Sequence, residues 1–311
     1  MTDAVATNSA HSREGGKPEA KDWVPASAGT SGHVLEQPFL ADLSAIRRLA
    51  GVLPGAWPVA VNAVRVAASI RPNKFVIEGG DDTPITMPRS AFQVVYPDAT
   101  VMIDSGLDRA THDSFSTPDK REPYFAEEFA KLQRALNAAR MIVLTHFHAD
   151  HVAGVTQAEN YDELARKTFV SVATAQCLLN TPHRPHLAMT AEQVNRLVIF
   201  DYGQYHPVAP GIVLIKAPGH SADHQMVYIA LQSGREILHS VDVGWVAENI
   251  AQITGKAAPW VKEDVPAVMG QLRWLNTIMR NERNIALMVT HDGELIDAAI
   301  KSGIIGGELK F

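Results

Sequence analysis

Residues 145–154, Thr-His-Phe-His-Ala-Asp-His-Val-Ala-Gly, place three histidines and an aspartate within six positions. Imidazole nitrogen and carboxylate oxygen are ligands that Zn²⁺ prefers, and a catalytic zinc needs at least three such ligands beside an open position. His146 and His148 are two residues apart, so an extended backbone directs both side chains to the same face. Asp150 and His151 follow around a turn, where they can face a second ion. The cluster therefore predicts a site for two metals.

Three further residues of ligand type stand at the ends of apolar, strand-like segments. They are His220 after the run 211–219, Asp242 at the end of 235–242, and His291 near the end of 285–292. Because the ends of strands in packed sheets can meet at one edge, we expect these side chains to join the first cluster. The expected set is five histidines and two aspartates.

This set of residues resembles the metallo-β-lactamase superfamily, whose H-x-H-x-D-H signature is present intact. The resemblance covers about residues 55–295. It implies that one zinc is held by His146, His148 and His220, the other by Asp150, His151 and His291, and that Asp242 bridges both. It also implies an α/β fold, a four-layer αββα sandwich of two mixed β-sheets with helices outside.

Two such metals imply hydrolytic chemistry. A water shared by two divalent cations loses a proton near neutral pH, and the cations stabilise the oxyanion that its attack creates. In this interpretation the bridging hydroxide is the nucleophile, Asp242 holds both metals, and Asp150 relays a proton to the leaving group. Zinc is the first choice of metal, and iron(II) or manganese suit the same ligands.

The carboxylate at Asp242 is similar to that of lactonase, glyoxalase II and phosphodiesterase relatives, whereas true β-lactamases commonly carry a cysteine there. The single cysteine, Cys177, lies at none of the ligand positions. We therefore expect hydrolysis of a small ester or lactone, similar to an acyl-homoserine lactone. A thioesterase similar to glyoxalase II and a phosphotriesterase-like hydrolase are the enzymatic alternatives. Outside enzymes, a metal-binding sensor on the same scaffold is the alternative.

Other residues near the cluster have weaker signals. His224 is expected to orient His220 or its loop, or to be structural, because metal-bound imidazoles donate their second N–H to a fixed partner. His183 and His186 lie in a segment with two prolines, Pro182 and Pro185, and a solvated turn is favoured over a substrate-facing loop. Asp104 is expected to support the metal loops. Trp245 replaces a tyrosine that lactonase relatives often place shortly after the bridging aspartate, and this weakens the lactonase interpretation.

The elements that must position these residues follow from the hydrophobic pattern. The expected strands are 60–69, 74–79, 91–97, 100–106, 141–145, 211–219, 225–231, 235–242 and 285–292. The expected helices are 122–140, 191–197 and 264–281. Apolar residues at helical spacing in 38–57 predict one more helix, which would cover either the active site or a partner, so a homodimer is possible.

Composition limits the remaining classes. Residues 1–32 have few large apolar groups and predict a mobile tail before one hydrolase domain, 33–311. The net charge is −6 and basic residues are scattered, so a nucleic-acid partner is not expected. No secretory signal or apolar stretch of about 18 residues occurs, so no membrane partner is expected. A cytoplasmic protein with a small-molecule substrate is the resulting expectation.

Overall fold

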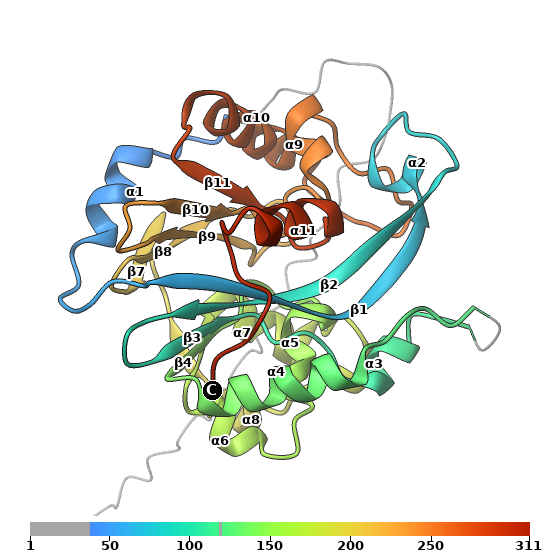
Figure 1. Ribbon diagram of the computed structural model, residues 1–311. Coiled ribbons are helices and arrows are strands. Elements are labelled where there is room, and N and C mark those ends of the chain that lie inside the picture. Colours follow the sequence, from blue (N-terminus) through green and yellow to red (C-terminus); the bar gives the residue numbers. More distant parts are fainter. Residues whose placement is uncertain (1–37, 118–119) are drawn as a thin grey trace, which may run out of the picture. The chain divides into compact units, whose positions relative to one another are not determined.

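Two β-sheets pack against each other in the computed structural model, which describes residues 38–117 and 120–311 (Figure 1). The first sheet contains β1 (Ala60–Pro72), β2 (Pro84–Val95), β3 (Thr100–Ile103), β4 (Met141–Val143), β5 (Thr168–Ser171) and β6 (Val198–Phe200), in that order. The second sheet contains, from one edge to the other, β11 (Ile285–Met288), β10 (Glu236–His239), β9 (Gln225–Ala230), β8 (Ile212–Lys216) and β7 (Tyr205–Ala209).

Both sheets are mixed. In the first sheet β1, β2 and β3 are antiparallel neighbours, and β3 to β6 run parallel. In the second sheet only β10 and β11 are parallel among the described pairs. Parallel strands need long crossover connections, and helices fill those connections in the first sheet.

Helices cover the outer faces of both sheets (Figure 1). Those associated with the first sheet are α3 (Arg109–Asp113), α4 (Ala126–Ala138), α5 (Ala149–Thr156), α6 (Tyr161–Ala165), α7 (Val172–Asn180), the 3₁₀ turn Pro185–Leu187 and α8 (Ala191–Val194). Those packed on the second sheet are α1 (Leu43–Ala50), α9 (Ala247–Gln252) and α10 (Val265–Asn281). The short α2 (Asn73–Val76) joins β1 to β2, and α11 (Gly293–Lys301) follows β11.

Three apolar clusters separate these four layers. Successive side chains of a strand point to opposite faces, so Phe92 and Val94 of β2 pack between the sheets while Ala91 faces the helices. The middle cluster also contains Leu214 and Ile229 from the second sheet. Each fully buried side chain of this size stabilises the fold by about 1.5–3 kcal/mol. The predicted αββα sandwich is therefore confirmed.

The predicted strand 74–79 is wrong. Its backbone instead forms α2 and the tip of the hairpin, where Asn73 N donates to Thr83 O at 2.8 Å and Lys74 N donates to Asp81 O at 2.7 Å. Val76 is buried in a small cluster with Trp245 instead of lying in a sheet. The apolar residues of this segment thus reflect local burial at the hairpin tip.

Other predicted boundaries also differ. The long helix begins at Ala126 and not at 122, because Pro123 O accepts from Ala68 N and Phe125 N donates to Val66 O, which holds this segment against β1. Strands β5, β6 and β7 were not predicted, because each is only three to five residues long. Short apolar runs of this kind carry too little periodicity to separate strand from loop.

The predicted N-terminal helix exists as α1, but it does not cover the metal ligands. Ile46 and Ala50 are buried against the outer face of the second sheet, in one cluster with Val213 and Ile215. Trp274 of α10 donates its ring N–H to Ala41 O at 3.0 Å and fixes the start of this helix. The expectation of a roof over the active site is therefore wrong, and a homodimer remains a prediction.

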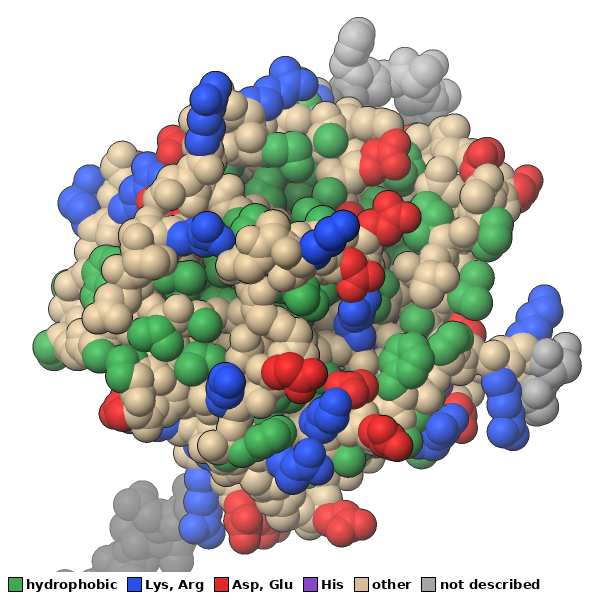
Figure 2. Space-filling view, viewed as in Figure 1, with side chains coloured by type: hydrophobic (Ala, Val, Ile, Leu, Met, Phe, Trp, Pro, Cys, Tyr) green, Lys and Arg blue, Asp and Glu red, His purple; other side chains and the backbone are tan. Residues whose placement is uncertain are grey.

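Surface features agree with the scattered charges of the sequence. On the face shown in Figure 2, basic and acidic side chains are interspersed. Within residues 38–117 and 120–311, the helices are all too short or too polar to cross a bilayer. The predicted tail, residues 1–32, lies outside the described residues, and the domain boundary at residue 33 stays a prediction.

Candidate metal centre

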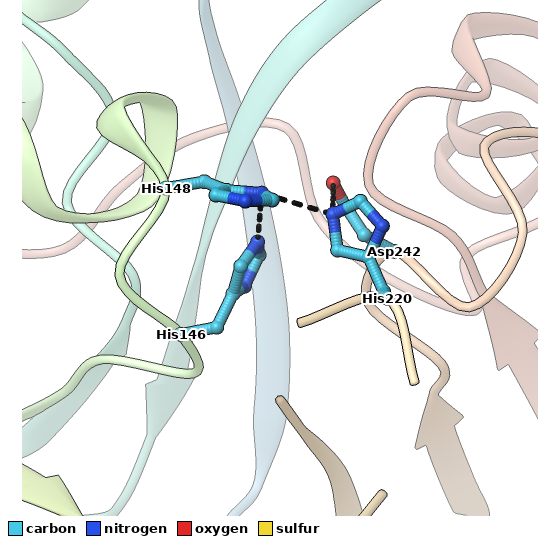
Figure 3. A group of neighbouring side chains, drawn as sticks. All are labelled: His146, His148, His220 and Asp242. Carbon is cyan, nitrogen blue, oxygen red and sulfur yellow. Dashed lines mark hydrogen bonds and ion pairs between the residues drawn. The ribbon is translucent and has the colours of Figure 1, made fainter. Parts of the chain in front are cut away.

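All seven predicted ligands converge in the structure. Their ligand atoms form two groups, and within each group they lie within 4.8 Å of one another. The first group is His146, His148, His220 and Asp242, and the second is Asp150, His151 and His291. In Figure 3, His148 lies between His146 and His220, and the Asp242 carboxylate lies beside His220.

Strand ends deliver these side chains to one place. The loop after β4 carries His146 and His148, and the first turn of α5 carries Asp150 and His151. The other ligands follow strands of the second sheet: His220 comes after β8, Asp242 after β10 and His291 after β11. Since the two sheets pack face to face, their strand ends meet at one edge of the sandwich.

The approach of α5 to the strand ends depends on Gly154. A Cβ atom at this position would lie 1.8 Å from Ser105 O, which leaves no room for any side chain. Gly154 N donates to Gly106 O at 3.0 Å, and Ser105 N donates to His151 O at 2.8 Å. The loop after β3 and helix α5 are thus held in direct backbone contact.

Asp242 lies between the two groups. Its Oδ2 atom is 3.5 Å from His220 Nε2 in the first group. The same atom is 3.5 Å from His151 Nε2 and 3.1 Å from His291 Nε2 in the second group. A single carboxylate is therefore positioned to contact ions in both groups.

Fixed partners determine which nitrogen each imidazole presents. His151 Nδ1 donates to Asp104 Oδ2 at 2.8 Å, His220 Nδ1 donates to Glu263 Oε1 at 2.5 Å, and His291 Nδ1 donates to Pro88 O at 2.7 Å. In a neutral imidazole the second nitrogen then carries a lone pair. In their neutral form, each of these imidazoles would direct its Nε2 lone pair toward the other ligand atoms of the cluster, which is the arrangement that a metal ligand needs.

The contacts of Asp104 confirm the supporting role that was predicted for it. Besides His151, its carboxylate accepts from Thr145 N at 2.8 Å and from Thr145 Oγ1 at 2.9 Å. Because Thr145 Oγ1 donates to Asp104, it can accept from His146 Nδ1, which lies 3.2 Å away. One buried carboxylate therefore orients a ligand of each group.

Two buried atoms of the cluster have no hydrogen-bond partner in the described part of the chain: His151 Nε2 and Asp242 Oδ1. Buried polar atoms are normally paired. Two unpaired atoms in one buried cluster therefore indicate a binding partner other than the described side chains. Nitrogen and carboxylate donors of this kind fit zinc, iron(II) or manganese. The cluster therefore fits a pair of divalent cations.

Electrostatics differ between the two groups. Burial lowers the pKa of His146, His148 and His220 well below the usual value, so these imidazoles are neutral at neutral pH. Burial also acts to lower the pKa of His151, but the carboxylates of Asp104 and Asp242 outweigh it and raise this pKa well above the usual value.

The two carboxylates of the cluster stay ionised. Burial acts to raise the pKa of Asp150, but His151, Arg89 and His291 lower it to about 2. Burial likewise acts to raise the pKa of Asp242, and His291 and His151 bring it well below the usual value. Both side chains are therefore anionic at neutral pH, as metal binding requires.

The sequence did not reveal a buried ion pair behind His220. Lys256, whose side chain is fully buried, donates to Glu263 Oε1 at 2.5 Å, to Asp242 O at 2.5 Å and to Val243 O at 3.1 Å. Glu263 in turn accepts from His220. Neither residue belongs to a local motif, so only their contacts in the folded chain identify them.

These contacts also hold a strained backbone. Val241 has a φ angle of 53°, a conformation that β-branched residues rarely adopt and that costs about 1–3 kcal/mol. The next residue is fixed from both sides, because Asp242 N donates to His224 Nε2 at 3.1 Å and Asp242 O accepts from Lys256. The strained turn therefore points the Asp242 side chain between the two ligand groups.

The remaining predictions have mixed outcomes. His224 Nδ1 donates to Ala217 O at 3.1 Å, in the segment that leads to His220, so the predicted role in orienting this loop is confirmed. Its Nε2 also accepts from Asp242 N, so it orients Asp242 as well. The solvated turn predicted for His183 is wrong: its Nδ1 accepts from Ala149 N at 3.0 Å, and its ring centroid lies 4.4 Å from that of His148. His186 is exposed, and its Nε2 lies 3.0 Å from Thr111 Oγ1.

Comparison with known proteins supports this description. Residues 99–263, more than half of the chain, match the family model of the beta-lactamase superfamily domain. N-acyl homoserine lactonases of Bacillus thuringiensis are 24% identical over 159 residues, which cover 49% of this chain and 56% of theirs. The match thus spans little more than half the length of these curated relatives.

Solved structures share the fold. An N-acyl homoserine lactone hydrolase with N-hexanoyl-L-homoserine at its catalytic metal centre has a TM-score of 0.61 and 16% identity over 78% of this chain and 96% of its own. A dizinc quorum-quenching lactonase has a TM-score of 0.55 and 12% identity over 78% of this chain and 92% of its own. Since the family model covers more than half of the chain and its fold recurs in these structures, the chain belongs to the β-lactamase superfamily.

Proposed function

We propose that the chain is a dinuclear metal-dependent hydrolase of a small ester or lactone, similar to an acyl-homoserine lactone. The position of Asp242 between two groups of inward-facing imidazoles is the observation that carries this proposal. A site for a single structural ion would be closed by its ligands, whereas seven side chains shared by two ions, with Asp242 common to both, would leave coordination positions for water and substrate.

Each residue has a role in this proposal. His146, His148 and His220 would hold one ion, Asp150, His151 and His291 the other, and Asp242 both. When bound, the two ions supply a water that ionises near neutral pH and Lewis acidity toward the scissile carbonyl oxygen.

Asp150 is the candidate for proton transfer. Its low pKa keeps it anionic, and its Oδ2 lies 3.7 Å from His291 Nε2, at the edge of the second group. In hydrolysis the water oxygen bonds to the carbonyl carbon, the bond from this carbon to the leaving oxygen breaks, and a proton must reach that oxygen. Asp150 would accept the proton from the water and deliver it to the leaving group.

The named relatives support a lactone as the first substrate to test. The N-acyl homoserine lactonases match less than half of this chain, so their substrate comes to it only as a proposal. Thioesters and phosphotriesters are the competing substrates, because two-metal sites serve acyl and phosphoryl centres alike.

The test combines metal content with a substrate panel. Protein purified without chelator should contain close to two divalent ions per chain, as measured by elemental analysis. A lactone, a thioester and a phosphotriester, each assayed with zinc, iron(II) and manganese, should show turnover that is highest for the lactone. Asp242→Ala should abolish turnover and lower metal content, whereas Asp201→Ala, an exposed position outside the cluster, should alter neither.

Turnover of the thioester or phosphotriester alone would replace the lactone assignment and keep the hydrolase. Two bound ions without turnover of any substrate would favour a metal-binding sensor. Protein that binds no divalent metal would overturn the proposal entirely.

A further inference from the structure

Two arginines and a phenylalanine form a cluster beside the metal centre that the proposed hydrolysis does not use. The guanidinium carbon of Arg89 lies 4.4 Å from the ring centroid of Phe115, and that of Arg184 lies 3.9 Å from the same centroid. Arg89 comes from β2, Phe115 from the segment after α3, and Arg184 from the loop after α7. Three distant segments thus bring two positive charges to one aromatic ring.

Arg89 is buried without a carboxylate of its own. Its side chain donates to Ser69 Oγ at 2.9 Å and lies 3.5 Å from His112 Nδ1, and both partners are uncharged in this arrangement. The nearby Glu122 is already paired with Arg71. Within the described residues no carboxylate lies within 4 Å of Arg89. A guanidinium that is only 5% exposed is therefore left without a counter-ion.

Arg184 also lacks a carboxylate partner among the described residues, but it lies nearer to solvent than Arg89. Its Nε atom is buried and has no hydrogen-bond partner among the described residues, and it has no ion pair there. The residue is half-buried, as is Phe115. A molecule that enters from solvent can therefore approach this side of the cluster. Leaving polar cationic groups unpaired is costly, so the arrangement favours an anion that arrives from outside.

The cluster borders the metal centre. Pro88, directly before Arg89, accepts through its carbonyl from the ligand His291. His183, directly before Arg184, has its ring centroid 5.6 Å from Phe115 and 4.4 Å from the ligand His148.

The charges around Arg89 agree with this placement. Burial lowers the pKa of Arg89, and the negative charge of Asp150 acts most strongly against that effect. The positive charge of Arg184 lowers the same pKa. One carboxylate, which the proposed function also assigns to the metals, does not balance the charges of two guanidinium groups.

We propose that Arg89, Arg184 and Phe115 form a substrate-binding subsite for a carboxylate group, so that the preferred ester or lactone carries an anionic carboxylate in addition to its scissile bond. This inference rests on the proposed hydrolase function for the same site. Guanidinium groups bind carboxylates with two parallel hydrogen bonds, and Phe115 holds both groups in place by stacking. An uncharged substrate leaves both arginines unpaired, so its kcat/KM should be lower than that of the anionic substrate.

The experiment compares two 4-nitrophenyl esters that differ only in charge: the monoester of glutaric acid, with a free carboxylate, and the ester of glutaramic acid, with a neutral amide. The wild-type holoenzyme should prefer the anionic ester at least about tenfold in kcat/KM, mainly through a lower KM. Arg184→Gln should lose about tenfold of this preference. Arg140→Gln, an exposed arginine outside the cluster, should keep the wild-type ratio.

Equilibrium binding gives a second measurement that does not depend on turnover. Calorimetric titration of the holoenzyme with glutaramate should show binding at least about tenfold tighter than with the uncharged glutaramide, and Arg184→Gln should remove that difference. If glutaramate binds through the metals alone, Arg184→Gln will not change its affinity, and the subsite is refuted.

The two proposals can fail separately. Hydrolysis of both esters with equal efficiency would overturn the carboxylate subsite and leave the hydrolase intact. Binding of glutaramate that depends on Arg184, without hydrolysis of any ester, would support the subsite and overturn the hydrolase.

Discussion

Replacing Lys256 by methionine tests whether the buried ion pair holds the metal ligands. The ammonium group makes three donated contacts, to the Glu263 carboxylate and to the carbonyls of Asp242 and Val243. Methionine keeps the length of the side chain but removes all three. The carboxylate of Glu263, whose side chain is only 5% exposed, then loses the ammonium group that pairs with it.

The magnitude follows from the burial of this charge. Removing one partner of a buried ion pair costs about 3–5 kcal/mol, because the remaining charge is left uncompensated. Lys256→Met should therefore lower the free energy of unfolding by this amount. The double variant Lys256→Met/Glu263→Gln removes the orphaned charge and should recover at least half of the loss. Lys262→Met, an exposed neighbour, should stay within about 0.5 kcal/mol of wild type.

Urea denaturation, followed by circular dichroism, measures these differences at fixed zinc concentration and again in chelator, because a bound metal adds its own stabilisation. Zinc affinity measured by competition should fall about 10- to 100-fold in the single variant, since Glu263 no longer holds His220 in a fixed position. A loss below about 1 kcal/mol would refute the reasoning. The reasoning would also be refuted if the free energy of unfolding of the double variant did not exceed that of Lys256→Met.

Three further substitutions test other contacts. Asp104→Asn removes the carboxylate that accepts from His151 and should weaken zinc binding about 10- to 100-fold by competition titration; unchanged affinity would contradict this. Gly154→Ala should lower the free energy of unfolding by about 3 kcal/mol or more, because the added methyl group would overlap Ser105 O. Helix propensity alone predicts a higher free energy of unfolding, and that result would contradict the steric argument. Burial lowers the pKa of His239 to about 4, so the unfolded state binds more protons between about pH 6.5 and 4, and stability falls on acidification. His239→Leu should reduce that fall by up to about 3 kcal/mol in urea titrations, and an unchanged pH dependence would exclude this cause.

The residues of the candidate metal centre could be named from the sequence because their types and their places at strand ends are local features. His146 to His151 lie within one strand-turn-helix segment, so their clustering is visible from spacing alone. Asp242 and His291 follow apolar runs that were predicted as strands, and strand ends converge where sheets pack. The errors fall where burial does not come from a sheet, as in α2, and where strands are very short, as in β6.

The sequence by itself determined the types of the ligand residues and indicated most of the strands and the long helices, since residue chemistry and hydrophobic period act over a few neighbouring positions. The layered αββα arrangement was expected only through the resemblance to the superfamily. Only the tertiary structure decided which groups support and surround those ligands. Glu263 contacts His220 across 43 positions, and Lys256 reaches Asp242 across 14. Arg89 and Arg184 meet at Phe115 from separate elements. Such contacts leave no periodic pattern, because they arise when the two sheets and their loops pack together.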